Sequence, residues 1–223
     1  MVYSIYIEGN IASGKSTLLR GLQVIQEATC FFEPVEDWRY ASFREHTPNL
    51  LKDFYLDPKT NARACQEAVL ETYAEMHSVD VSNTFKIQER SIHSSSIFRS
   101  VLVEEHYLTA VQDEELGSIY RATCASVPST PDLVLYLRSD PMLCLQLMQE
   151  RGRTEEREVG LPYLTKLHYA HEHWIKTCPY PVLTLENSAG ADAVKRSAIA
   201  AIFRTFAENK IRDYLDSNEN AVA

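Results

Sequence analysis

The segment from Gly9 to Ser16 constrains this chain more than any other. Its sequence, Gly-Asn-Ile-Ala-Ser-Gly-Lys-Ser, fits the pattern G-x-x-x-x-G-K-[ST] at every fixed position. A short apolar run at 2–7 precedes it, and a helical pattern follows from Lys15 to Ile25. A glycine-rich turn between a strand and a helix presents backbone N–H groups and a positive helix N-terminus to phosphate. The pattern therefore predicts a phosphate-binding loop on an α/β fold.

The chemistry of this loop assigns roles to its residues. Lys15 supplies a cation to the β- and γ-phosphates of ATP, and the Ser16 hydroxyl is a ligand for Mg²⁺. We expect ATP to be bound by Gly9, Asn10, Ile11, Ala12, Ser13, Gly14, Lys15, Ser16 and Thr17. The chain has no Asn-Lys-x-Asp guanine-reading motif, and no long apolar strand that ends in the aspartate of a motor-type ATPase. A small-molecule kinase is therefore favoured over a switch or a motor.

Apolar runs and helical patterns alternate along the rest of the chain. Strands are predicted at 2–7, 30–32, 84–88, 132–137 and 181–185. Helices are predicted at 15–25, 61–81, 141–151, 161–177 and 191–214, and residues 97–123 are predicted to be mainly helical. This alternation favours right-handed crossovers between parallel strands. The predicted fold class is α/β, an open parallel sheet of about five strands of the P-loop NTPase type with helices on both faces.

Composition limits the partners. The 223 residues, of which 45% are hydrophobic, suit one globular domain, which we place at 1–215, with a polar C-terminal tail at 216–223. The formal net charge of −9 disfavours nucleic acid, which needs a basic face. No run of about 18 apolar residues predicts a membrane span, and the five scattered cysteines form no CxxC pair. We expect no nucleic-acid or membrane partner and a cytoplasmic location, with the nucleus or a host-cell cytosol as alternatives.

Further motifs follow the loop in a fixed order. They are Glu-Pro-Val-Glu-Asp-Trp at 33–38, Glu-Arg-Ser at 89–91, Tyr-Leu-Arg at 136–138, Arg-Gly-Arg-Thr-Glu-Glu at 151–156 and Leu-Pro-Tyr-Leu at 161–164. With the loop, they resemble the deoxyribonucleoside kinases, the family of deoxycytidine, deoxyguanosine and mitochondrial thymidine kinases. The resemblance covers roughly residues 2–186. The compact chain and its departures from the motifs also suit a viral thymidine kinase of this type.

The resemblance implies ATP-dependent phosphorylation of the 5′-hydroxyl of a deoxyribonucleoside in nucleotide salvage. The catalytic residues it implies are Glu33, Arg90, Arg151 and Arg153, and the magnesium residues are Ser16 and Glu89. Glu33 resembles the family's general base, and its ordinary pKa of about 4.3 leaves it ionised at neutral pH and able to accept a proton. The arginines at 151 and 153 form a lid over the transferred phosphoryl group. Taken alone, Glu33 could equally be a surface glutamate, and 151–156 a solvated charged turn.

The same resemblance implies a nucleoside pocket. Its residues are Trp38, Tyr55, Gln66, Tyr73, Ser95, Phe98 and Glu156. Gln66 reads the base edge through its amide, Trp38 is an aromatic wall, and Phe98 stacks on the base. Tyr55 and Glu156 bind the sugar 3′-hydroxyl. Without the ordered motifs, core packing would explain the aromatic residues equally well.

Some positions depart from the family pattern. Leu147 stands where several relatives carry an additional lid arginine, and Arg157 is a candidate to supply that charge. Tyr73 and Ser95 stand where purine-accepting relatives tend to carry arginine and aspartate. Because a large Tyr73 narrows the pocket, we predict that thymidine and deoxycytidine are preferred over purine deoxynucleosides.

Two alternative functions stay open. A nucleoside monophosphate kinase of the thymidylate kinase type would need extra basic groups for the acceptor's phosphate, and no such cluster is evident near Glu33. A non-catalytic nucleotide-binding protein would keep the loop without needing Glu33, Arg90 and the lid arginines. The resemblance also implies a small-molecule nucleoside substrate and a homodimer, which the sequence permits.

Overall fold

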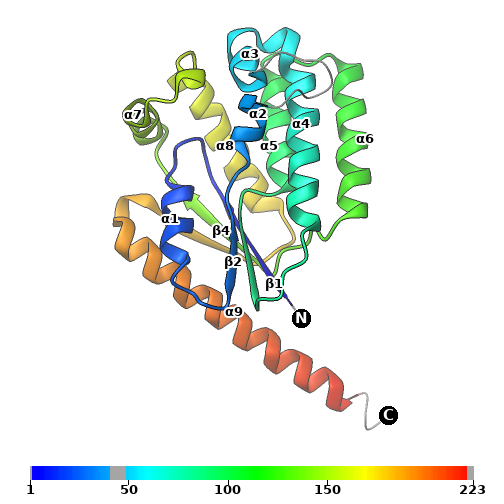
Figure 1. Cartoon of the computed structure of the whole chain (residues 1–223), viewed down its shortest axis with the longest axis vertical. Coiled ribbons are helices and arrows are strands. Elements are labelled where there is room, and N and C mark those ends of the chain that lie inside the picture. Colours follow the sequence, from blue (N-terminus) through cyan, green and yellow to red (C-terminus); the bar gives the residue numbers. More distant parts are fainter. Residues whose placement is uncertain (1, 41–48, 220–223) are drawn as a thin grey trace.

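The computed structural model describes residues 2–40 and 49–219 of the chain. In this part of the chain, five parallel strands form one sheet in the order β2-β3-β1-β4-β5, with helices packed around it (Figure 1). The strands are β1 (Tyr3–Glu8), β2 (Ala28–Phe31), β3 (Phe85–Glu89), β4 (Leu133–Arg138) and β5 (Val182–Glu186). The predicted α/β class, with an open sheet of about five parallel strands, is confirmed.

Helices alternate with the strands. Their bounds are α1 (Lys15–Leu22), α2 (Val35–Tyr40), α3 (Leu50–Leu56), α4 (Pro58–Ser78), α5 (Ile92–Glu104), α6 (Ala110–Ser126), α7 (Pro141–Arg151), α8 (Leu161–Thr177) and α9 (Ala191–Glu219). Short 3₁₀ turns, η2 (Thr154–Glu156) and η3 (Asn187–Ala189), precede α8 and α9. Both α7 and α8 have the predicted bounds, because a proline in the first turn marks each start. None of the described helices combines the length and apolar character that a membrane crossing requires.

Alternate residues of the strands pack on opposite faces of the sheet. Ile5 and Ile7 of β1 belong to the core formed with α1 and α9. Tyr6, between them, points to the other face, where its hydroxyl lies 3.1 Å from Nδ1 of His77 on α4. On that side α4, α5 and α6 run side by side, whereas α9 extends away from the sheet (Figure 1). Both faces are therefore covered, as expected for a parallel sheet.

Residues 97–123 are mainly helical, as predicted, and they belong to two separate helices, α5 and α6. His106 has φ 57, a left-handed conformation that ends α5. Thr109 then starts α6, since its Oγ1 accepts a hydrogen bond from the backbone N–H of Gln112 at 3.2 Å. Periodicity does not predict α2 and α3, which are too short to show it. The helix α9 runs through residue 215 and ends at Glu219, and the predicted domain boundary there stays a prediction.

The strand register brings the motif-bearing loops to one edge of the sheet. Ile7 of β1 pairs with Glu89 of β3, and Phe31 of β2 pairs with Gln88. The phosphate loop, the 32–34 turn and the turn after Glu89 all leave the sheet at these carboxyl ends. Ligands of open α/β sheets bind at such an edge.

Candidate active site

The phosphate loop uses backbone conformations that require glycine. Gly9 has φ 152, and a Cβ there would lie 2.6 Å from the carbonyl oxygen of Leu137. Gly14, with φ 96, turns the chain directly into α1. The side chain of Lys15 folds back over the loop, where Nζ donates to the carbonyl of Asn10 at 2.6 Å. The helix N-terminus and this cation therefore face the same space.

A cavity of about 410 Å³ opens beside the loop. The loop residues that line it are Ile11, Ala12, Gly14, Lys15, Ser16 and Thr17. The other predicted ATP residues lie behind them and support the loop. The carbonyl of Gly9 accepts a hydrogen bond from Arg90 Nη1 at 3.1 Å. Asn10 Nδ2 donates a hydrogen bond to the carbonyl of Leu164 at 2.8 Å. Ser13 is buried. The cavity size is typical of a small-molecule site.

Glu33 and Arg90 meet inside this cavity. Arg90 Nε lies 2.7 Å from Glu33 Oε1, in contact as an ion pair although the N–H is not aligned for a hydrogen bond. Burial opposes the charge of both groups, but Arg90 and Lys15 lower the pKa of Glu33, and Glu33 in turn raises the pKa of Arg90. Both groups are therefore charged at neutral pH.

The turn that carries Arg90 is strained and tightly held. Arg90 is only 2% exposed and has φ 63, a left-handed conformation that costs a non-glycine residue about 1–2 kcal/mol. Glu8 at the end of β1 accepts hydrogen bonds from Ser91 Oγ and Ser94 Oγ, each at 2.6 Å. Burial raises the pKa of Glu8, while Arg90 opposes this rise. These contacts fix the first turn of α5 beneath the cavity.

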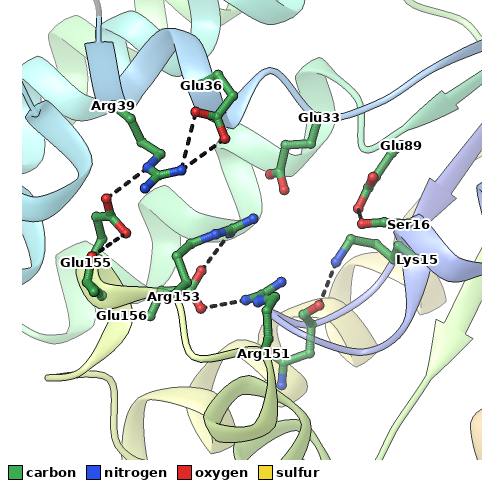
Figure 2. A network of polar contacts seen from close by, with 12 residues as sticks. Lys15, Ser16, Glu33, Glu36, Arg39, Glu89, Arg151, Arg153, Glu155 and Glu156 are labelled. Carbon is green, nitrogen blue, oxygen red and sulfur yellow. Dashed lines mark hydrogen bonds and ion pairs between the residues drawn. The ribbon is translucent and has the colours of Figure 1, made fainter.

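Ser16 and Glu89 offer oxygen ligands at one corner of the cavity. Ser16 Oγ donates to Glu89 Oε1 at 2.8 Å, and both residues line the cavity (Figure 2). Among the described residues, no cluster of three or more histidine, cysteine or acidic side chains could hold a metal ion by itself. Mg²⁺ commonly takes one or two protein oxygens and completes its shell with phosphates and water. This donor set fits Mg²⁺ bound together with a triphosphate.

The lid arginines are paired within their own segment. Arg151 Nη2 donates to Glu156 Oε2, and Arg153 Nη1 donates to Glu156 Oε1 at 2.8 Å (Figure 2). Both guanidinium groups line the cavity, as does Leu147. Arg157 is exposed and does not line the cavity, so its position does not support it as a replacement for the missing arginine. Glu156 therefore contacts the two cations that were predicted to bind phosphate.

The neighbouring glutamate ties the lid to the opposite wall. Glu155, 4% exposed, accepts a hydrogen bond from Arg39 Nε at 2.8 Å (Figure 2). It also accepts one from Asn49 Nδ2 at 3.0 Å. Burial opposes its charge, but the hydrogen bonds from Asn49, its own backbone and Arg39 lower the pKa to about 2. We call these three side chains the lid latch. It joins η2 to α2 and to the start of α3.

The predicted nucleoside residues lie at the other end of the cavity. Those that line it are Trp38, Tyr55, Gln66, Tyr73, Phe98 and Glu156. Gln66 Oε1 is buried and has no hydrogen-bond partner among the described residues. Because an unpaired buried carbonyl is costly, this atom marks a place for a ligand donor. The Phe98 ring also contacts Arg90, whose guanidinium carbon lies 4.8 Å from the ring centroid.

Ser95 is the exception among these residues. It does not line the cavity, because its hydroxyl turns back onto its own helix and donates to the carbonyl of Ile92 at 2.7 Å. The structure does not support Ser95 as a substrate residue, and Ser94 takes its place on the wall. Phe98 lies on the wall of the cavity, as predicted.

Some wall residues are not predicted from the sequence. They are Arg20, Val35, Leu51, Phe54, Cys65, Val69, Ser94 and Leu147. Arg20 lies one helical turn after Ser16, and this i, i+4 spacing is a signal that could have found it. Leu51 and Phe54 lie on α3, a helix too short for hydrophobic periodicity to predict, so no pattern marks them as wall residues. The latch pair of Arg39 and Glu155 has no local sequence signal.

The parallel sheet, the phosphate loop at a strand end and the arginine-lined cavity together define a P-loop protein built to handle a nucleoside triphosphate. A model of the "Deoxynucleoside kinase" family matches residues 5–208. The chain belongs to the deoxynucleoside kinase family, and the predicted resemblance is confirmed.

Curated relatives agree with this family. The chain is 33% identical over 183 residues to mitochondrial thymidine kinase 2 of Macaca fascicularis, covering 80% of this chain and 66% of the relative. It is 31% identical over 201 residues to deoxycytidine kinase of Rattus norvegicus, covering 78% and 75%. It is 33% identical over 184 residues to a probable deoxycytidine kinase of Fowlpox virus, covering 77% and 71%. The matches span slightly less than two thirds of the thymidine kinase 2 relatives from macaque and Homo sapiens.

Proposed function

We propose that this protein transfers the γ-phosphoryl group of ATP to the 5′-hydroxyl of a deoxyribonucleoside and so produces a deoxynucleoside monophosphate for salvage. One observation carries the proposal. Glu33 Oε1 is held by Arg90 and Tyr73, whereas Oε2 has no partner among the described residues. The phosphate loop lines the same cavity. An ionised carboxylate oxygen therefore shares a small-molecule pocket with a triphosphate site.

The arrangement supports direct transfer. Glu33 accepts the proton of the 5′-hydroxyl as that oxygen attacks the γ-phosphorus, and the bond from the γ-phosphorus to the β–γ bridging oxygen breaks to leave ADP. Lys15 and Arg90 are fixed cations at the sheet edge, and Arg153 approaches from the lid. These groups spread the negative charge that develops on the phosphoryl oxygens.

Magnesium fits this proposal through Ser16 and Glu89. When bound, it would neutralise charge on the β- and γ-phosphate oxygens. The hydrogen bond between Ser16 Oγ and Glu89 Oε1 keeps the two oxygens together and close to Lys15. Glu89 directly precedes Arg90, so one strand end carries both a magnesium residue and a phosphate-binding cation.

The wall of the pocket supports a pyrimidine preference. Tyr73 is 1% exposed, and its ring meets Trp38 edge-to-face with centroids 5.9 Å apart. Trp38 Nε1 in turn donates to Thr72 Oγ1 at 3.0 Å. Because these rings are packed and bonded, the space between them and Gln66 cannot widen cheaply for a purine. We propose thymidine and deoxycytidine as the preferred acceptors.

We also propose a homodimer, as the family resemblance implied. A second hollow lies between α4 and α6 and has a partly apolar wall that includes Leu50, Ala64, Ala68 and Ile119. Ile119 is 38% exposed at this surface. Light scattering after size-exclusion chromatography tests this assembly, and a monomer at micromolar concentration would contradict it.

A nucleoside panel tests the function. ADP release is measured with ATP, Mg²⁺ and each of thymidine, deoxycytidine, deoxyadenosine and deoxyguanosine, with thymidine monophosphate offered in parallel. We expect turnover on the pyrimidine nucleosides, and a Glu33→Gln enzyme that binds them without turnover. Turnover on the monophosphate alone would instead indicate a monophosphate kinase. No turnover on any acceptor would contradict the proposal.

A further inference from the structure

The hydroxyl of Tyr73 contacts the carboxylate that the proposed reaction uses. Tyr73 lies on α4, 40 residues after Glu33, and its OH donates to Glu33 Oε1 at 3.0 Å. Arg90 Nε lies 2.7 Å from the same oxygen. No other hydrogen-bond partner of the Tyr73 hydroxyl is found among the described residues. Two groups from different parts of the chain therefore converge on one carboxylate oxygen.

This convergence makes the two oxygens of Glu33 unequal. Oε1 has a hydrogen-bond donor and a cation beside it, whereas Oε2 is left to accept a proton from outside the protein. With Arg90 alone, the carboxylate could rotate about its last side-chain bond and exchange its oxygens. The phenol restricts this rotation because Tyr73 is itself immobilised, 1% exposed and packed against Trp38.

We propose that the Tyr73 hydroxyl is a positioning group for Glu33, with a role separate from that of the Tyr73 ring in limiting pocket volume. This inference rests on the proposed function, in which Glu33 activates the acceptor alcohol. The hydroxyl orients the carboxylate, and the ring selects the base. Tyr73 thus links the selection of the nucleoside base to the activation of the 5′-hydroxyl.

The charges around Glu33 define what loss of the hydroxyl would do. The groups that face it are Arg90 from the turn after β3, Lys15 from the phosphate loop, Tyr73 from α4, Arg153 from the lid and Tyr55 from α3. Burial raises the pKa of Glu33, and Arg90, Lys15, the Tyr73 hydrogen bond and Arg153 outweigh it to give a lowered pKa. Removing the Tyr73 hydrogen bond therefore raises the pKa. Only ionised Glu33 accepts a proton. As the pH is lowered, a variant without the hydroxyl would therefore lose activity at a higher pH than the parent enzyme does.

The test separates the hydroxyl from the ring. Tyr73→Phe removes the hydroxyl and keeps the ring, whereas Tyr73→Met removes both. For Tyr73→Phe we expect kcat with thymidine to fall about tenfold, as for loss of a hydrogen bond to a charged group, with little change in KM. The acidic limb of the kcat–pH profile moves to higher pH in both variants. The ratio of thymidine to deoxyguanosine turnover changes only in Tyr73→Met, because only that variant opens the pocket.

The outcomes distinguish this inference from the proposed function. If Tyr73→Phe keeps the kcat and the acidic limb of the parent enzyme, the positioning role fails, while nucleoside turnover and its loss in Glu33→Gln still uphold the function. If the parent enzyme phosphorylates no nucleoside, the function itself fails. Thermal denaturation checks folding, and Tyr73→Met supplies the same pH test should Tyr73→Phe be unstable. A pH shift without a change in base ratio for Tyr73→Phe supports the proposal.

Discussion

The two sides of the cavity hold their charges in different ways. At the sheet edge, Glu33 and Arg90 sit on turns that follow strands, Lys15 begins α1, and Arg90 is only 2% exposed. In the lid, the side chains of Arg151 and Arg153 are 34% and 25% exposed; Arg151 is the last residue of α7, and Arg153 follows it. The cations at the edge are fixed by contacts across the core. The lid cations are held by one carboxylate of their own segment, Glu156.

This difference indicates that the two sides of the cavity have different roles. Arg90 is held by Glu33 and by the carbonyl of Gly9, and such a fixed arrangement avoids the free-energy cost of reorganisation during the reaction. Under the proposed function, Arg151 and Arg153 exchange their hydrogen bonds to Glu156 for bonds to phosphate oxygens, which leaves Glu156 free to bind the sugar. The lid latch of Arg39, Asn49 and Glu155 keeps η2 near the cavity while that exchange takes place. Substitutions on one side of the cavity at a time test this difference.

The largest effect is expected at the sheet edge. Glu33→Gln removes the proton acceptor but keeps the shape, so kcat falls by a hundredfold or more, within the range of about 10²–10⁴ expected for loss of a general base. Thymidine affinity, measured by calorimetry, changes little because glutamine keeps the shape of the pocket and the other wall residues are unchanged. A near-normal kcat in this variant would show that Glu33 is not the general base. The sheet edge would then have no larger catalytic effect than the lid.

A smaller loss is expected in the lid. Arg153→Ala removes one charge-assisted contact to phosphate, and kcat falls about 10- to 100-fold because Lys15, Arg90 and Arg151 remain. The matched control is Arg157→Ala, which removes an exposed arginine of the same segment that does not line the cavity. Equal losses in the two variants would show that general lid charge, rather than the position of Arg153, matters.

The edge also predicts a pH dependence of ATP binding. Burial and Arg90 lower the pKa of Lys15 to about 8, although Glu33, Glu89 and Glu8 oppose this. The free enzyme therefore loses this cation as pH rises above about 8, and ATP affinity falls by up to about tenfold by pH 9. Calorimetric titrations with ATP between about pH 7 and pH 9.5 measure this fall in affinity. Arginine keeps its charge over this pH range. The Lys15→Arg variant therefore binds ATP more weakly, but its ATP affinity does not change with pH.

The smallest effect is expected from the latch. Glu155→Ala frees η2 from Arg39 and Asn49, and kcat falls only a few-fold, roughly three- to tenfold. Amide hydrogen exchange across 151–160 becomes faster in this variant. Glu36→Ala is the control, because Glu36 contacts Arg39 at 3.0 Å but is exposed, where an ion pair contributes little. Unchanged exchange in Glu155→Ala would show that the lid is held by other contacts.

Much of the fold follows from local sequence signals. The five strands were each predicted within a few residues, because buried parallel strands are continuous apolar runs bounded by turn residues. The break between α5 and α6 and the short helices α2 and α3 are not predicted from the sequence. A left-handed His106 and helices shorter than two turns leave no trace in hydrophobic periodicity. Most of the predicted site residues do line the cavity, and Ser95 is displaced because its hydroxyl turns back onto the helix.

The sequence by itself determined the phosphate loop, the strand order along the chain and the family. Each of these depends on residue types at fixed short spacings, such as the glycines at 9 and 14. Only the tertiary structure decided how Glu33 is oriented, which carboxylate holds the lid arginines and which groups latch the lid. The Tyr73–Glu33 and Arg39–Glu155 contacts join residues 40 and 116 positions apart. Such pairs form only once the sheet and helices have packed, so no local pattern encodes them.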